Sequence, residues 1–492
     1  MAQDKELDVV GRLERRLHAS LIATLSAQSS TDQTSSSNLP RVLGPWQATA
    51  IVVGTIIGSG IFLVPQEMMR AAGSSSLVYA AWIAAGLLSL FGAMTYAELA
   101  AMRPFAGGEY VYLRDAYGEL PSFLYMWTWF SVAKPASIAS SAIGVVRVLG
   151  IFAALGWLSK PLFLHPWRLD WGQIVAIGLT WLITGLNYLG LRRAGVFQLI
   201  FTILKVVLIL GIIFFCFMSP LGHGSNFSTI FIGGRGGVAG FTVAMIAALW
   251  AYDGWNDLNM VAGEIQRPER SIPLALIAGV GLVAALYMLT NAAVEYLLPA
   301  IAIAGSPRPA SDAMLIAVGV WGAGLVSVGM VVSILASLNG TILSGARIPF
   351  AAARDGIFFR SMAHIHPRFE SPSVSLGVQA AMSTVLLLLV GRFQALFELA
   401  LLGEWIFYML TATTLFTFRR REPNRLRPYR VPGYPWLPAI FIAAAGLVIV
   451  YLFKSNLHNS IGGLLVIALG LPMYVWMLHR RASAKKTSLT DL

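Results

Sequence analysis

Charged side chains are scarce in this chain of 492 residues, because Asp, Glu, Lys and Arg together make up only 12% of it. Hydrophobic residues make up 57%, and the mean hydropathy is +0.71. Soluble globular domains carry about 25% charged residues. The composition therefore excludes a soluble protein and predicts an all-α integral membrane protein with several spans.

Cysteine is almost absent, since Cys216 is the only one, and a single cysteine excludes an intramolecular disulfide. The chain also lacks the His-Glu-x-x-His pattern of zinc proteases, the Gly-x-Ser-x-Gly elbow of hydrolases and a Walker-type phosphate loop. These absences argue against a membrane enzyme. We expect no metal and no cofactor.

Twelve apolar segments are long enough to be membrane helices. They lie at 46–69, 77–102, 121–149, 171–189, 196–218, 238–262, 272–298, 320–342, 374–390, 396–418, 436–452 and 461–477. The polar segment 1–41 is rich in Ser, Thr and Gln, has no signal-peptide pattern and is predicted to be a disordered tail. We therefore expect a transporter domain at 42–480 and a short tail at 481–492.

Lysine and arginine are unevenly distributed between the loops. If the N-terminus is cytoplasmic, the cytoplasmic segments carry 25 of these residues and the outside loops carry seven. Such a bias is typical of membrane proteins and predicts that both termini are cytoplasmic. The net charge of +12 is then explained by topology and by contact with lipid, and not by nucleic-acid binding.

The first span contains Gly58-Ser59-Gly60 near its middle. Glycine weakens a helix interior by about 1 kcal/mol, and a broken helix is tolerated in a membrane only where it is buried in protein or lines a polar cavity. A break would expose N–H groups that can bind a carboxylate. The alternative is that Gly58 and Gly60 only allow close helix packing.

The sixth span contains a second interruption, at 249–259, with two aspartates, two asparagines and a glycine. Such residues are costly in a membrane unless they face a cavity. Breaks in spans one and six are typical of transporters built from two inverted five-helix repeats, which bind substrate between the breaks.

These features resemble the amino acid–polyamine–organocation superfamily and, within it, the L-type amino acid transporters and their bacterial relatives. The resemblance covers residues 41–434 and depends on five patterns that occur in order. They are the segment 53–62, the segment Ala251-Tyr252-Asp253-Gly254-Trp255-Asn256, the segments 98–99 and 107–110, the segment 345–356, and the segment 427–434. It implies a LeuT-like 5+5 inverted repeat with discontinuous helices 1 and 6, plus helices 11 and 12.

The resemblance also implies how an amino acid would bind. The carboxylate would meet the N–H groups of Ser59 and Gly60 and the Ser59 hydroxyl, and the ammonium would meet the carbonyl oxygens of Ile56, Trp250 and Asp253. The Trp250 indole would act as an outer gate, unless it is only a packing aromatic. The complete predicted set is Ile56, Gly58, Ser59, Gly60, Trp250, Ala251 and Asp253.

Some residues depart from the family pattern. Animal L-type transporters are linked to a single-span glycoprotein through a cysteine between spans three and four, and residues 152–170 contain none. We therefore expect a stand-alone carrier without a disulfide-linked heavy subunit, in a bacterial inner membrane. Asp253 stands where animal members have glycine, and Glu404 stands where some members have an uncharged polar residue.

Ionisable residues within the spans need partners, because an unpaired charge at the bilayer centre costs about 3 kcal/mol. Lys134 and Arg147 are expected to pair with a carboxylate or with carbonyls, and Glu98 and Glu264 to form salt bridges at helix ends. Glu404 could line the cavity, take up protons or only hold span ten in place.

Lys205 lies in the middle of span five, among aliphatic residues. It could form an ion pair with an acid of another span. Sodium-independent relatives carry a lysine at the matching place, which implies that its ammonium replaces a sodium ion near the first break and span eight. Gating or coupling roles are thus expected for Lys205, Trp250 and Glu404.

The resemblance implies a sodium-independent, exchanger-like carrier of neutral L-amino acids that works by alternating access. A proton-coupled carrier, or a permease for cationic amino acids or polyamines, is the alternative. A channel and a transport-dead sensor remain open, although no repeated filter-like pattern is visible.

Overall fold

The computed structural model describes the backbone of residues 39–490, except 151, 164–168, 390–392 and 456. Arg41–Leu492 form one compact unit. The segment predicted to be a disordered tail lies, up to residue 38, outside the described residues. Two short strands, β1 (Pro161–Phe163) and β2 (Leu169–Asp170), form an antiparallel pair.

A helix lies at each of the twelve predicted spans. They are α2 (Pro45–Ile56) with α3 (Gly60–Ala72), α4 (Ser75–Met102), α6 (Glu119–Thr128) with α7 (Lys134–Leu149), α8 (Trp171–Tyr188), α9 (Leu191–Met218), α10 (Gly237–Ala251) with α11 (Asp257–Met260), α12 (Pro268–Leu297), α15 (Val320–Gly345), α17 (Ser373–Leu389), α18 (Phe393–Arg421), α19 (Trp436–Ser455) and α20 (Leu457–Thr490). Shorter connecting helices are α5 (Glu109–Tyr117), α13 (Ala300–Gly305), α14 (Pro309–Val318) and α16 (Arg347–Arg354). Short 3-10 helices lie at Ala153–Ser159, Gly224–Ser228, Ala262–Glu264 and Arg360–Ala363.

Among the described residues, nine helical segments are long and apolar enough to cross a membrane, with α2 and α3, α6 and α7, and α15 and α16 each counted as one. The other predicted spans correspond to α8, α10 and α17, which have 18, 15 and 17 residues. The chain is therefore an all-α, multi-pass membrane protein. The helix α14 was not predicted, because its ten residues are too few for a span.

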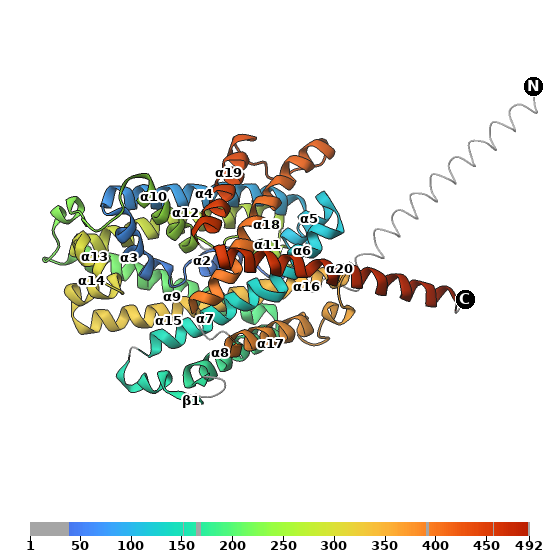
Figure 1. Cartoon of the computed structure of the whole chain (residues 1–492), viewed down its shortest axis with the longest axis horizontal. Coiled ribbons are helices and arrows are strands. Elements are labelled where there is room, and N and C mark those ends of the chain that lie inside the picture. Colours follow the sequence, from blue (N-terminus) through green and yellow to red (C-terminus); the bar gives the residue numbers. More distant parts are fainter. Residues whose placement is uncertain (1–38, 151, 164–168, 390–392, 456, 491–492) are drawn as a thin grey trace, which may run out of the picture. The chain divides into compact units, whose positions relative to one another are not determined.

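The broken first span lies at the centre of the bundle. Its apolar window is 78% buried, against 28% for α9 and 17% for α20. In Figure 1, α2 and α3 lie between α10 and α12 on one side and α9 and α15 on the other, and α2 packs against α9, α12 and α15. Pro45 begins α2, where its missing N–H is not needed. Gly73 ends α3 in the left-handed conformation, with a φ of 74°.

The third span contains a π-helical turn, Trp129–Ala133, between α6 and α7. The Lys134 N–H donates to the carbonyl of Trp129, five residues earlier. Proline clashes with the carbonyl four residues before it in an ordinary helix. The wider turn relieves that clash for Pro135, and π turns of this kind are frequent at functional sites.

Ion pairs connect the helix ends on the side that the charge distribution predicts to be cytoplasmic. The Arg347 guanidinium donates to both Glu264 carboxylate oxygens, at 2.8 and 3.0 Å, and both side chains are buried. Glu98 accepts hydrogen bonds from the Arg419 guanidinium, at 2.9 and 2.6 Å, and from the Val431 N–H. The prediction of salt bridges for Glu98 and Glu264 is confirmed.

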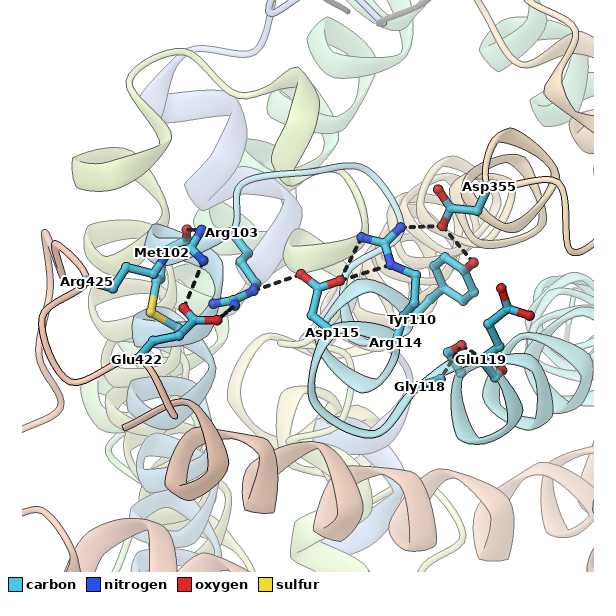
Figure 2. A network of polar contacts seen from close by, with 11 residues as sticks. Met102, Arg103, Tyr110, Arg114, Asp115, Gly118, Glu119, Asp355, Glu422 and Arg425 are labelled. Carbon is cyan, nitrogen blue, oxygen red and sulfur yellow. Dashed lines mark hydrogen bonds and ion pairs between the residues drawn. The ribbon is translucent and has the colours of Figure 1, made fainter. Parts of the chain in front are cut away.

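A second network joins α5, α16 and the segment after α18. Figure 2 shows Arg103 between Asp115 and Glu422, at 2.9 and 2.5 Å. Arg114 joins Asp115 to Asp355, and the Tyr110 hydroxyl donates to Asp355 at 2.7 Å. These bonds hold together segments more than 200 residues apart in the sequence.

We predict that Arg347→Met destabilises the protein by about 3–5 kcal/mol, because it leaves the Glu264 charge buried without its partner. Arg481→Ala is the control, because Arg481 pairs with Glu119 at a partly exposed site, where an ion pair contributes about 0–1 kcal/mol. Thermal unfolding in detergent measures both. The double variant Arg347→Met with Glu264→Leu should recover stability, and equal losses in the two single variants would contradict the argument.

Candidate functional site

The first break leaves backbone donors without a helical partner. After α2, the Gly58 N–H turns back to the Ile56 carbonyl at 2.8 Å, and α3 begins at Gly60. Within the described part of the chain, no backbone carbonyl accepts from the N–H groups of Ser59 and Gly60. These donors lie at the positive end of α3, where an anion is stabilised.

The second break lies directly against the first. The helix α10 ends at Ala251, and a turn leads to α11 at Asp257. Gly254, in the left-handed region with a φ of 107°, packs on Thr55, and the Thr55 hydroxyl donates to the Gly254 carbonyl at 2.8 Å. A Cβ at Gly254 would lie 3.1 Å from the Thr55 backbone, so glycine permits this close approach.

A cavity of about 120 Å³ lies between the two breaks. Every residue of the predicted substrate-binding set lines it, and so does Glu404. Several other lining residues were not predicted from the sequence. They are Thr55, Trp129, Ser137, Ser140, Ser141, Gly144, Ile334, Ser337, Thr341 and Tyr408. These residues come mainly from α7, α15 and α18, where a small polar residue among apolar ones gives little signal in the sequence.

The cavity holds several ionisable groups. Lys134 forms an ion pair with Asp257, which confirms the expectation that Lys134 is paired. Asp253 accepts a hydrogen bond from the Tyr408 hydroxyl at 2.9 Å. Glu404 is 7% exposed. Asp257 is the ion-pair partner of Lys134. Asp253 and Glu404 are two further carboxylates that line the cavity.

A hydrogen-bonded chain leads from this cavity to α5. The Tyr408 hydroxyl also contacts the Asn256 side-chain oxygen at 3.1 Å, and the Asn256 amide donates to Glu109 at 2.7 Å. The Tyr125 hydroxyl donates to the other Glu109 oxygen at 3.1 Å. Burial raises the pKa of Glu109 to about 7, and the hydrogen bond from Asn256 opposes this shift.

Lys205 lies beside the cavity and braces the first break. Its Nζ donates to the carbonyls of Gly54, Ile57 and Ser333, at 2.9, 2.5 and 3.0 Å. Within the described residues no carboxylate pairs with it, so the alternative of an ion pair is wrong there. The resemblance implied this position, near the first break and span eight.

Tyr287 of α12 joins the carboxyl ends of the two half-helices. Its hydroxyl contacts the carbonyl of Ile56 at 3.1 Å and that of Ala251 at 2.9 Å. This role could not be predicted, because Tyr287 is one aromatic residue in an apolar span.

The comparison with known families agrees with this geometry. A family model described as an amino acid permease matches residues 43–477. The chain belongs to the amino acid permease family. It is thus a membrane transporter of amino acids and not an enzyme.

Curated relatives cover nearly all of the chain. The serine/threonine exchanger SteT of Bacillus subtilis is 31% identical over 92% of this chain and 100% of its own length. The human b(0,+)-type amino acid transporter 1 is 29% identical over 92% of this chain and 91% of its own. The rabbit large neutral amino acids transporter small subunit 2 is 29% identical over 89% and 80%. The resemblance to the superfamily and its L-type members is confirmed.

We predict that Gly60→Val lowers substrate affinity about tenfold or more. A Cβ at this position would lie 3.0 Å from the Ala251 Cβ and 3.1 Å from its Cα, so α3 must move away from α10. This movement would displace the donors, and one charge-assisted hydrogen bond contributes about 1.5–3 kcal/mol. Gly178→Val in α8 is the control, because a Cβ there would meet no atom within 4 Å and α8 does not line the cavity. Uptake measured over a range of substrate concentrations gives the affinity of both variants. Equal affinities would contradict the proposal that the N–H groups of Ser59 and Gly60 bind the substrate carboxylate.

Proposed function

We propose that the protein exchanges small neutral L-amino acids across the membrane by alternating access, without sodium. The observation that supports this proposal is the cavity between the two breaks, whose lining includes Ile56, Ser59, Gly60 and Trp250. Among the described residues, no backbone carbonyl accepts from the N–H groups of Ser59 and Gly60. The N–H groups at the start of α3 suit a carboxylate, and the carbonyl oxygens at the ends of α2 and α10 suit an ammonium. A free amino acid carries both groups, so it is the favoured substrate.

The size of the cavity favours a small side chain. An engineered cavity of about 150 Å³ binds benzene, and this cavity measures about 120 Å³. A substrate with few side-chain atoms therefore fits best. The serine/threonine exchanger among the relatives agrees with a substrate of this size.

Lys205 supports the absence of sodium coupling. Its ammonium already supplies a positive charge to the carbonyls of Gly54, Ile57 and Ser333. A sodium ion would need the same oxygen atoms. We infer that the fixed ammonium takes the place of the ion.

A second candidate rests on Asp253 and Glu404, the two further carboxylates at the cavity. They would suit a cationic side chain or a bound proton. A permease for cationic amino acids or polyamines, or a proton-coupled carrier, would use them directly.

We further infer that the protein works as a stand-alone carrier in a bacterial plasma membrane, with both termini in the cytoplasm. The excess of Lys and Arg in the loops on one side supports this orientation. The lack of a cysteine at 152–170 argues against a disulfide-linked heavy subunit.

We expect reconstituted protein to take up labelled serine saturably, and faster when the vesicles contain unlabelled serine. Competition with alanine, serine, leucine and arginine then tests specificity. Alanine and serine should compete best, because the cavity is small. Inhibition by arginine alone, with a selective loss of this inhibition in Asp253→Asn, would favour the second candidate. Uptake that does not saturate would exclude a carrier.

We predict that uptake persists when choline replaces sodium on both sides, and that Lys205→Ala is strongly impaired. Lys205→Arg should also fail, because a planar guanidinium does not match a site formed for a compact ammonium. Lys454→Ala is the control, since Lys454 lies exposed near the end of α19. A collapse of wild-type uptake without sodium would show that Lys205 does not take the place of the ion.

A further inference from the structure

A second cavity, with no charged residue in its lining, lies between α4 and α12. It measures about 230 Å³, and its lining includes Gly86, Gly281 and Ala284. Ile83 and Leu87, also in its lining, are about half exposed on the apolar surface. The cavity is therefore open to the hydrocarbon region of the membrane, near the middle of both helices.

Two polar groups at this cavity have no hydrogen-bond partner in the part of the chain that the structure describes. They are the Tyr252 hydroxyl and the Trp82 Nε1–H, and both side chains line the cavity while being 1% and 0% exposed. A buried polar group without a partner is rare in proteins and needs an explanation.

Gly86 allows the Tyr252 hydroxyl to pack closely against α4. A Cβ at position 86 would lie 3.0 Å from the hydroxyl oxygen and 3.2 Å from Cζ. Gly281 faces the space from the opposite helix, and a Cβ there would meet no atom within 4 Å. Gly281 thus leaves open space at the cavity, whose lining includes the Tyr252 side chain.

The wall of this cavity is also the back of the substrate site. Tyr252 follows Ala251 in the second break, and Trp82 contacts the rings of Tyr252 and Tyr287 edge-on, with centroids 5.7 and 5.3 Å apart. Tyr287 in turn holds the carbonyls of Ile56 and Ala251. An occupant would therefore contact Trp82 and Tyr252, whose rings pack against Tyr287.

We propose that this cavity binds a small neutral amphiphile from the membrane, with a hydroxyl or carbonyl oxygen that accepts a hydrogen bond from Tyr252 or Trp82. A charged ligand is excluded because the lining offers it no partner. A phospholipid acyl chain would fill the space but carries no acceptor at this depth. The volume exceeds that of a cavity that binds benzene, about 150 Å³, and so suits a medium-chain alcohol or ketone.

The test uses a diazirine derivative of 1-octanol as a photolabel on the full-length protein in lipid nanodiscs. We expect saturable labelling of peptides from α4, α12 or the 252–256 turn, with competition by 1-octanol and none by octane at equal membrane concentration. Tyr252→Phe should weaken binding about fivefold, since it removes one neutral hydrogen bond. Gly281→Leu should abolish labelling because its side chain fills the cavity.

Gly211→Leu in α9 is the matched control, because a Cβ there also meets no atom within 4 Å and the cavity is untouched. It should label like the wild type. Unchanged thermal unfolding of each variant shows that folding is intact. Equal competition by octane and octanol, or labelling that survives Gly281→Leu, would overturn the proposal and leave an apolar groove filled by lipid.

Discussion

Backbone groups in a membrane must be satisfied within the protein, and this constraint governs the centre of the molecule. Two broken helices free several carbonyl and N–H groups at once. The side chains of Lys205, Thr55, Ser333 and Tyr287 satisfy the carbonyl oxygens around the breaks. The N–H groups of Ser59 and Gly60 have no such partner among the described residues, and the substrate can supply it.

The charged side chains at the helix ends and those beside the two breaks are paired in different ways. At the helix ends, arginines pair with glutamates, as in Arg347 with Glu264, and join distant segments of the chain. Beside the breaks, Lys134 pairs with Asp257, while Lys205, in the part of the chain that the structure describes, donates to three carbonyls and to no carboxylate. The interior therefore keeps one fixed ammonium for the backbone, and it leaves Asp253 and Glu404 at the cavity where a substrate or a proton could meet them.

Much of this arrangement could be predicted from the sequence, because the free-energy cost of a glycine or a charge within a membrane helix depends on that residue's own position in the sequence. Gly58-Ser59-Gly60 and the polar segment around Asp253 indicated both breaks, and the resemblance to the family implied the place of Lys205. Tyr287 and Tyr408 could not be predicted, since each acts through a hydroxyl whose partner is distant in the sequence. The identity of the acid that pairs with Lys134 could not be predicted either, because it depends on how span three packs against span six.

The π-helical turn in span three has a consequence for the register of that helix. In an α-helix, residues five apart point about 140° away from each other. In the wider turn the Lys134 N–H bonds to the Trp129 carbonyl, which places these two residues one above the other. Both line the same cavity for that reason. The extra residue thus rotates all of α7 relative to α6, so that one span presents an aromatic ring and a charged amine to the same point.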